Sequence, residues 1–432
     1  MEKAEIIVIG AGATGLMVAR ELAKAGKKVI ILEAIDRVGG RIFPLDEEEF
    51  GYPAQGGAEF IHGEAPLTKS LLREAGLNYV SMPEDGEMWS FDGNELKKAY
   101  LFTEDPEFIK YREIINERLN ELVDDIPIST FLEKYFSDEK YSRLVNVINN
   151  MVKGFDAADP HKISTFSLKE EWLGQTEWKQ GRIKEGYGPM INFLVSECKK
   201  YSVELLTNKE VKSVKIDNDT INVLCTDGNL YNGQRVIVTV ALPIIKNIKF
   251  SPTIHEKIEA IDKIGFGQVI KILIKFKDQW WTSNSQHKNI NKMVFMLCNG
   301  KVNAWWTQYP EQYPVLTGWI AGPEAEKLKH ESEKEIFNLC LSSLSDIWKA
   351  DKDFIKEKVV TYQVVNWPAD PFTKGAYSYS MANSEKAYAK LREPVENKIF
   401  FAGEALYKET ETATVEGALA SGLEVARQII HF

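Results

Sequence analysis

The sequence has few residues of the types that build metal sites and disulfide frameworks. Its 432 residues include only four cysteines and six histidines. The cysteines (Cys198, Cys225, Cys298 and Cys340) form no C-x-x-C pair, and no H-E-x-x-H motif is present. We therefore expect neither a metal site nor a disulfide framework.

The chain also lacks long apolar runs and any excess of positive charge. No apolar stretch approaches the ~20 residues that a membrane-spanning helix needs. The formal net charge of −10 and the pI near 5.4 disfavour nucleic acid and anionic membranes as partners. Because the N-terminus leads directly into an apolar strand, no signal peptide is expected. These features predict a cytoplasmic protein without a membrane anchor, a monomer or homodimer of two or three domains.

The first 42 residues carry a complete dinucleotide-binding pattern. An apolar run, Ile6–Ile9, predicts a buried strand, and a G-x-G-x-x-G motif follows at Gly10, Gly12 and Gly15. In this motif the glycines make a tight turn, let the backbone approach a pyrophosphate, and let helix and strand pack closely. The expected helix, Thr14–Ala25, directs its N-terminus at the phosphates. After a second strand, Glu33 is placed to accept hydrogen bonds from a ribose.

Beyond this pattern, helical and strand-like segments alternate. Residues from Pro66 to about Leu173 are expected to be mostly helical, as is Lys327–Ile347. Strands are expected at residues 203–206, 211–216, 220–225, 235–240, 268–276, 294–297, 304–308 and 315–320. The chain closes with a strand at 398–402, Gly403-Glu404 and a helix at about 415–430. Since both ends carry strand–glycine–helix units, we expect the last strand beside the first in one sheet.

Further motifs are spread over the rest of the chain. They are AIDRVGGR at 34–41, GAEFIHG at 57–63, WPADPF at 367–372, GAYSY at 375–379, FAGE at 401–404 and TATVEGA at 412–418. Together with the N-terminal pattern, these motifs resemble those of the flavin-dependent amine oxidases. That family includes monoamine oxidases, polyamine oxidases, L-amino-acid oxidases and lysine-specific histone demethylases.

The resemblance implies an α/β fold with two interleaved domains. The first is a doubly wound, Rossmann-like FAD-binding domain, expected at residues 1–66, 185–262 and 393–432. The second is an α+β substrate-binding domain with a mixed sheet, expected at residues 67–184 and 263–392.

The resemblance also implies which residues hold FAD. Arg37 and Arg41 would neutralise the pyrophosphate, the backbone of Val211 would contact adenine, and Glu404 would lie on the ribityl-phosphate side. Ala376 stands where mitochondrial monoamine oxidases carry a flavin-linked cysteine, so FAD is expected to be non-covalent. The implied cofactor-binding set is Gly10, Gly12, Ala13, Thr14, Gly15, Glu33, Ala34, Arg37, Gly39, Gly40, Arg41, Gly57, Ala58, Glu59, Phe60, Val211, Trp367, Gly403, Glu404, Ala413, Thr414 and Val415.

Lys271 is the principal candidate for a catalytic side chain. Strand alternation places Lys271 and Lys275 on one face, which alone is typical of two solvent-exposed lysines. The resemblance implies another role for Lys271, because the family's active-site lysine stands in a similar G-x-V-I-K run and holds a water near flavin N5. Lys275 is expected to face solvent.

Three further residues are expected on the substrate side. Tyr377 matches an aromatic wall of the family's amine cage, and such a ring tolerates a cation. Thr414 matches the opposite wall, where monoamine oxidases carry a second tyrosine. His62 is expected either to exchange a proton near neutral pH or to be structural. Glu59 is expected to contribute its backbone rather than to bind a substrate ammonium.

Aromatic residues outside these motifs are either core or channel lining. We expect some of the following to line a substrate channel: Trp172, Trp178, Trp305, Trp306, Tyr309 and Trp319.

The implied reaction is FAD-dependent oxidation of a primary or secondary amine, such as a polyamine or monoamine. A hydride would pass to flavin N5, the imine would be hydrolysed, and O2 would be reduced to hydrogen peroxide. Three alternatives remain open: an L-amino-acid oxidase, a desaturase or porphyrinogen oxidase, and a flavoprotein without turnover. The first needs an arginine for the carboxylate, with Arg112, Arg143 and Arg182 as candidates.

Overall fold

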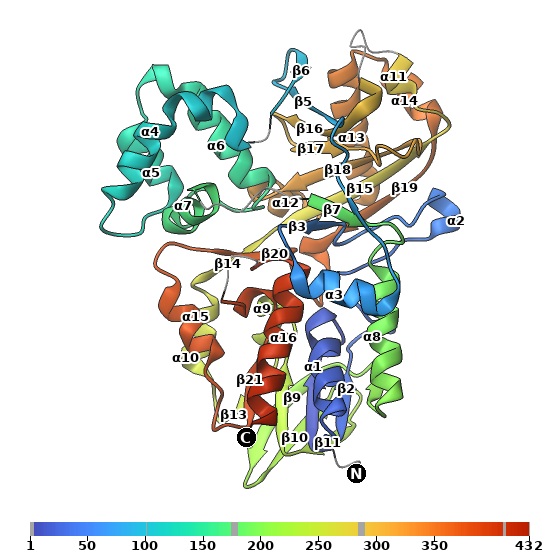
Figure 1. Ribbon diagram of the computed structural model, residues 1–432, viewed down its shortest axis with the longest axis vertical. Helices are drawn as coiled ribbons and strands as arrows, with labels where there is room; N and C mark the ends of the chain where they lie inside the picture. Colours follow the sequence, from blue (N-terminus) through green and yellow to red (C-terminus); the bar gives the residue numbers. More distant parts are fainter. Residues whose placement is uncertain (1–3, 101, 174–179, 284–289, 409–411, 432) are drawn as a thin grey trace.

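The computed structural model describes residues 4–100, 102–173, 180–283, 290–408 and 412–431. Its lower part is a sheet with flanking helices, near which both chain ends lie (Figure 1). A second sheet lies at the upper right and a cluster of helices at the upper left. The predicted α/β class is confirmed.

A five-stranded parallel sheet forms the centre of the lower part. Its strands, in spatial order, are β21 (Ile399–Phe401), β12 (Arg235–Val238), β1 (Ile6–Ile9), β2 (Val29–Leu32) and β8 (Glu204–Leu206). The last strand of the chain thus joins the same sheet as the first, but the expectation that it lies beside β1 is wrong. β12 lies between β21 and β1 and pairs with both.

Both faces of this sheet are covered, which explains why β1, β2 and β21 are apolar at every position. In β1, Ile6 and Val8 pack toward a layer of helices, whereas Ile7 and Ile9 pack toward a second sheet. The helices are α1 (Ala13–Lys24), α3 (Pro66–Ala75), α8 (Gly188–Lys200) and α16 (Val415–Ile430). The covering sheet has the order β11 (Leu230–Gly233), β10 (Thr220–Cys225), β9 (Val211–Asp217) and β13 (Lys249–Ser251).

A seven-stranded mixed sheet forms the upper right part. Its order is β19 (Val359–Asn366), β15 (Val269–Phe276), β18 (Val315–Ala321), β17 (Ala304–Trp306), β16 (Met293–Cys298), β5 (Glu87–Phe91) and β6 (Leu96–Lys98). Helices pack on it: α11 (Trp280–Ser283), α12 (Pro323–Leu328), α13 (Glu333–Trp348) and α14 (Lys352–Lys358). β15 lies between β19 and β18 and is buried at every position except Lys275.

The helical cluster at the upper left has its own apolar core. It consists of α4 (Pro106–Asn120), α5 (Ile128–Tyr135), α6 (Ser142–Gly154) and α7 (Thr165–Leu173). Trp172 and Phe108 lie in this core.

Short elements connect the three parts. They are β3 (Phe60–His62), β4 (Tyr79–Ser81), β7 (Gln180–Ile183), β14 (Ile264–Gly267), β20 (Tyr377–Ser380), α2 (Glu47–Phe50), α9 (Leu242–Ile245), α10 (His255–Ile261) and α15 (Glu385–Arg392). β3 and β4 pair with β7, and β14 pairs with β20.

One sequence-based expectation about these elements is confirmed and one is wrong. The segment from Pro66 to Leu173 is mostly helical, as expected, although it also contains the short strands β4, β5 and β6. The helix expected at Lys327–Ile347 is two helices, α12 and α13. Ser332 caps α13 in a capping box with Glu335, and this cap separates the two helices.

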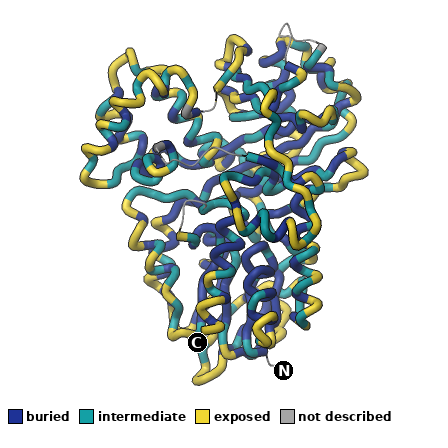
Figure 2. The backbone as a smooth tube through the Cα atoms, viewed as in Figure 1, coloured by how far each residue is buried: buried dark blue, intermediate teal, exposed yellow. Residues whose placement is uncertain are grey.

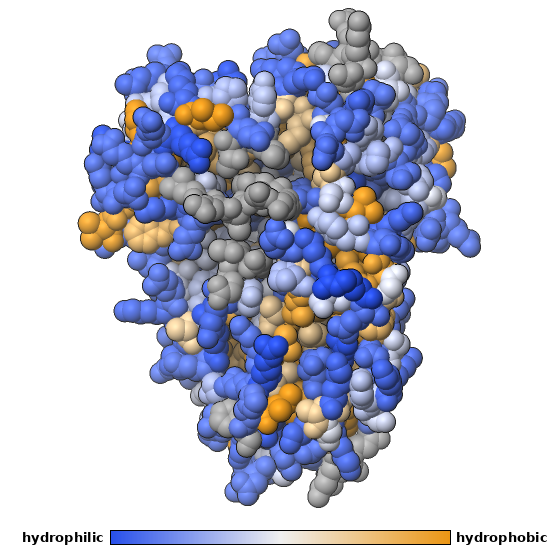
Figure 3. All heavy atoms as spheres, viewed as in Figure 1, coloured by the Kyte–Doolittle hydropathy of each residue, from blue (hydrophilic) through white to orange (hydrophobic). Residues whose placement is uncertain are grey.

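Buried residues concentrate in the sheets and in the inner faces of the helices (Figure 2). The face in Figure 3 is mainly hydrophilic, with apolar side chains in separate patches. Within the described ranges, no helix is long and apolar enough to cross a membrane. The same ranges contain no group of three or more His, Cys, Asp or Glu side chains arranged to hold a metal ion.

Candidate active site

A cavity of about 1940 Å³ runs between the three parts of the molecule. Ligand pockets commonly measure about 300–1,000 Å³, so this cavity has room for a cofactor and a substrate together. It is lined by every residue of the predicted cofactor set except Gly15 and Gly403, and also by Lys271, Tyr377 and His62. The fold therefore gathers residues from distant motifs around one space.

The dinucleotide-binding turn forms one end of the cavity. A Cβ on Gly15 would lie 2.0 Å from the carbonyl oxygen of Gly10, so this glycine permits close packing inside the protein. A Cβ on Gly12 would have no protein atom nearer than 4.0 Å. Gly12 lines the cavity at the N-cap of α1, which leaves space there for a ligand. This arrangement fits a pyrophosphate at the helix N-terminus.

Glu33 lies at the end of β2, beside this turn. Its Oε2 accepts a hydrogen bond of 2.7 Å from the Ala11 N–H, and its Oε1 accepts one of 3.2 Å from the Ile35 N–H. Burial raises the pKa of Glu33, and these backbone donors oppose the rise. The carboxylate is thus held by the chain at the cavity wall, where a ribose hydroxyl would reach it.

The two arginines of the second motif have internal partners. Arg37 donates to the Gly40 carbonyl at 2.9 Å and lies over the Phe43 ring. Arg41 donates to Glu404 Oε1 at 2.7 Å and to the Ala376 carbonyl at 2.7 Å. Arg41 therefore forms an ion pair with Glu404, a buried residue of the FAGE motif at 401–404.

Lys271 lies on β15 with its side chain 1% exposed. Its Nζ contacts Glu59 Oε2 at 2.8 Å and donates to the Gly57 carbonyl at 3.2 Å. Burial lowers the pKa of Lys271, and the Glu59 carboxylate opposes that effect. Lys271 therefore forms a buried ion pair with Glu59 at the wall of the cavity. Lys275 is the one position of β15 that is not fully buried, and its Nζ donates to the Glu49 carbonyl at 2.6 Å.

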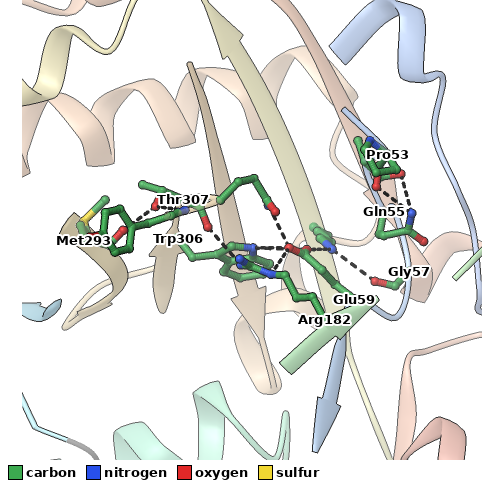
Figure 4. Close-up of polar contacts among 12 residues, drawn as sticks. Pro53, Gln55, Gly57, Glu59, Arg182, Met293, Trp306 and Thr307 are labelled. Atoms are coloured by element: carbon green, nitrogen blue, oxygen red, sulfur yellow. Dashed lines mark hydrogen bonds and ion pairs between the residues drawn. The ribbon is translucent and has the colours of Figure 1, made fainter. Parts of the chain in front are cut away.

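Glu59 is the centre of this polar network (Figure 4). Besides Lys271, its carboxylate accepts hydrogen bonds from Trp306 Nε1 at 3.2 Å and Gln308 Nε2 at 2.9 Å. Arg182 Nε lies 3.3 Å from Glu59 Oε1. Although burial favours its neutral form, Lys271 and Arg182 hold the pKa of Glu59 below its ordinary value. The expectation that Glu59 contributes its backbone took no account of this carboxylate, which is the shared counter-ion of Lys271 and Arg182.

His62 is the last residue of β3 and lines the cavity. Its ring meets the Phe155 ring edge-on, with centroids 5.8 Å apart. Burial lowers its pKa to about 4, so the imidazole is uncharged at neutral pH. The neutral form favours hydrogen bonding over proton exchange near pH 7.

Tyr377 is the first residue of β20, and Thr414 directly precedes α16. The Tyr377 hydroxyl donates to the Phe155 carbonyl at 2.6 Å, which fixes the orientation of the ring. Thr414 is the N-cap of α16, where its side chain accepts from the Gly417 N–H at 3.0 Å. Both residues line the cavity.

Comparison with known proteins agrees with this arrangement. The family model described as Flavin containing amine oxidoreductase matches residues 13–430. The chain belongs to this family. The predicted resemblance is confirmed, and the cofactor of the oxidoreductase is FAD.

Two curated relatives show how far the similarity extends. The oxidoreductase is 29% identical to Polyamine oxidase 2 of Arabidopsis thaliana, over 98% of this chain and 87% of that protein. It is 27% identical to Lysine-specific histone demethylase 2 of Homo sapiens, over 99% of this chain. The chain spans 53%, about half, of that demethylase.

Two solved structures share the fold. Putrescine oxidase bound to putrescine superposes with a TM-score of 0.81 at 19% identity and 100% coverage of both chains. Cyclohexylamine oxidase from Brevibacterium oxydans IH-35A has a TM-score of 0.82 at 18% identity, covering 100% of this chain and 99% of that one.

Of the aromatic residues named as candidates for a substrate channel, Trp306 and Trp319 line the cavity, whereas Trp172, Trp305 and Tyr309 do not. Trp178 lies outside the described residues.

Sequence analysis missed some residues of the cavity. Asp156 and Glu171 also line the cavity, although no motif marks them. Their sequence context is that of ordinary charged residues near helices, so spacing gives no signal for them.

Proposed function

We propose that this FAD-dependent amine oxidase converts a primary or secondary amine into an imine, which water hydrolyses to a carbonyl compound. The observation that carries the proposal is the position of Lys271, a buried cation in the same cavity as the dinucleotide-binding turn. When bound, FAD supplies a hydride acceptor at N5 and a route for electrons to dioxygen, which yields hydrogen peroxide.

The wall of the cavity suits an uncharged amine next to a flavin. Tyr377 offers a fixed aromatic face, and Trp306 and Trp319 add apolar surface. His62 is neutral near pH 7, so the substrate nitrogen meets no cation from this residue. The role of Lys271 is to hold a polar group, such as a water, close to the reacting atoms through its remaining N–H donor.

The residues around the cavity support non-covalent binding of FAD. Cys198, Cys225 and Cys340 do not line the cavity. Cys298 does, but burial raises the pKa of its thiol, which disfavours a reactive thiolate. Denaturation of the purified holoprotein is expected to release all of the flavin into the supernatant. Flavin that stays with the precipitated chain would contradict this part of the proposal.

One experiment tests the reaction itself. The purified holoprotein is mixed anaerobically with putrescine, spermidine, butylamine, phenylethylamine or an L-amino acid, and flavin absorbance is followed. We expect an amine to bleach the flavin, and oxygen to restore its colour with stoichiometric hydrogen peroxide. Bleaching by no amine would remove the proposed activity.

An L-amino-acid substrate is the alternative that this experiment separates. Among the three candidate arginines, only Arg143 lines the cavity. Arg182 is paired with Glu59 and donates to the Thr307 carbonyl at 3.0 Å, so its guanidinium is already occupied. Bleaching by L-amino acids alone, lost in Arg143→Gln, would replace the amine proposal.

We further propose that the protein is cytoplasmic and acts as a monomer or homodimer without nucleic-acid partners. All four cysteines are buried free thiols, as expected in a reducing compartment. The net charge of −10 opposes binding to polyanions. Light scattering after size exclusion, with and without DNA, measures the assembly state and shows whether the protein binds DNA.

A further inference from the structure

Two cationic side chains share one buried carboxylate at the wall of the cavity. Glu59 Oε2 lies 2.8 Å from Lys271 Nζ, and Glu59 Oε1 lies 3.3 Å from Arg182 Nε (Figure 4). The side chains of Lys271, Glu59 and Arg182 are 1%, 7% and 15% exposed. Because a single carboxylate faces two cations, the group keeps a surplus of positive charge beside the space that the dinucleotide-binding turn also lines.

Further contacts hold both cations in place. Arg182 Nη2 donates to the Thr307 carbonyl at 3.0 Å, and the guanidinium carbon lies 4.6 Å from the centroid of the Phe60 ring. Lys271 Nζ donates to the Gly57 carbonyl at 3.2 Å. Neither cation can turn away from the carboxylate without losing these contacts, so the two compete for it at fixed positions.

Glu59 and Arg182 act on the charge of Lys271 in opposite directions. Burial lowers the pKa of Lys271; the Glu59 carboxylate opposes this effect, and the Arg182 guanidinium adds to it. Tyr52, which interacts with Glu59 and Arg182, is neutral near pH 7 because burial raises its pKa. His62 is neutral as well, because burial lowers its pKa to about 4. A counter-ion and a competing cation therefore set the charge of Lys271.

We propose that Glu59 and Arg182 are opposing positioning residues for the reaction with dioxygen: Glu59 keeps a positive charge on Lys271, and Arg182 weakens that effect by competing for the carboxylate. The inference rests on the proposed function, since it requires FAD in the same cavity. Dioxygen accepts two electrons and one proton from the reduced flavin and a second proton from solvent, and leaves as hydrogen peroxide. A fixed buried cation stabilises the negative charge that develops on oxygen. Lys271 supplies this charge and gives up no proton.

The oxidative half-reaction is measured without an amine. The holoenzyme is titrated to full reduction with dithionite, and its reoxidation by dioxygen is followed by stopped-flow absorbance between pH 6 and pH 10. In wild type the rate constant should fall at alkaline pH, as Lys271 loses its proton. In Glu59→Gln the fall should occur at a pH lower by about one unit or more, and in Arg182→Met at a higher pH. The same pH dependence in all three proteins would overturn the inference, whatever the amine assay shows.

Opposite shifts distinguish this role from a structural one, because lost packing would change both variants in the same direction. Glu185→Gln is the matched control: Glu185 follows β7 closely, but its carboxylate accepts from Asn78 at 2.6 Å and does not line the cavity. The control should keep the wild-type pH dependence. A shift as large as that of Glu59→Gln would show that net charge, not this pairing, is responsible, and would overturn the proposal.

The same charges are also measured without flavin, by chemical denaturation of the apoprotein. A double-mutant cycle of Glu59→Gln with Lys271→Met should give a favourable coupling, and a cycle of Arg182→Met with Lys271→Met an unfavourable one. Couplings of the same sign would overturn the proposal. If Glu59→Gln is too unstable to purify, Glu59→Gln combined with Arg182→Met carries the wild-type net charge at this site. Its rate constant should still fall at a lower pH than that of Arg182→Met alone, and an equal or higher pH would overturn the proposal.

Discussion

The two ends of the cavity are built in different ways. At the dinucleotide end, Gly10, Gly12 and Glu33 lie within 24 consecutive residues, and their positions follow from one strand, one turn and one helix. At the amine end, Glu59, Arg182 and Lys271 come from three distant segments that meet only after folding. The first end is specified by local backbone geometry, the second by long-range charge pairing. Each prediction below tests one side of this contrast.

The largest effect is expected from adding one methyl group at Gly15. In Gly15→Ala the new Cβ would lie 2.0 Å from the Gly10 carbonyl oxygen, which is backbone and cannot move aside without displacing the turn. We expect a loss of more than about 4 kcal/mol in unfolding free energy, or failure to fold. Chemical denaturation of the apoprotein measures it.

Gly12→Ala is the matched control for that change. Its Cβ would meet no protein atom nearer than 4.0 Å, so apoprotein stability should change by less than about 1 kcal/mol. FAD affinity should fall, because the methyl group occupies space at the N-cap of α1. A Gly12→Ala apoprotein as unstable as Gly15→Ala would show that both glycines serve the fold alone.

The contrast between the dinucleotide end and the amine end of the cavity explains which features the sequence could and could not predict. The strand–turn–helix at the N-terminus was predicted almost to the residue, because each signal lies within a few positions of its partner. β5 was missed because it is short and its partner β16 lies about 200 residues further along the chain. The break between α12 and α13 did have a local signal, Ser332 and Glu335 in capping-box spacing.

At the site, the family resemblance indicated Lys271 but not its surroundings. Glu59 was expected to contribute its backbone, and the G-A-E-F-I-H-G motif gives no information about the residues that face its side chain. Its partners Trp306 and Gln308 belong to β17 and the segment after it. Pairing of this kind depends on the register between strands, for which the sequence contains no local pattern.

The next largest effect is expected from removing the charge at the centre of the amine end. Glu59→Gln leaves Lys271 and Arg182 buried near each other without a counter-ion. We expect a loss of about 3–5 kcal/mol in unfolding free energy, the usual cost of breaking a buried ion pair from one side. Thermal and chemical denaturation of wild type and variant measure the loss.

Glu59→Gln combined with Lys271→Met tests the reason for that loss. The double variant retains one buried cation instead of two, so it should be more stable than Glu59→Gln alone. A double variant that loses the sum of the two single effects would show that Glu59 and Lys271 are not coupled.

A smaller effect on stability, with a clear effect on turnover, is expected for Lys271→Met. Methionine fills much of the buried volume, and Glu59 keeps Arg182 as a counter-ion, so the loss should be about 1–3 kcal/mol. FAD should remain bound, while flavin reduction or reoxidation slows about 10-fold or more. Stopped-flow absorbance measures both half-reactions. Unchanged rates in a folded variant would remove Lys271 from the chemistry.

The smallest effect is expected at His62, and only in acid. Because burial lowers the pKa of His62 to about 4, the folded chain binds fewer protons than the unfolded chain between that value and the ordinary pKa near 6.5. Stability is therefore complete above about pH 6.5 and declines as the pH falls toward 4. In His62→Gln this decline should be smaller, by about 1 kcal/mol at pH 5 after allowing for partial exposure of the ring.

Wild type and variant should have the same pH dependence of unfolding between pH 7 and 8. A difference confined to that range would mean that His62 is charged near neutrality, and would place a proton-transfer group at the amine end.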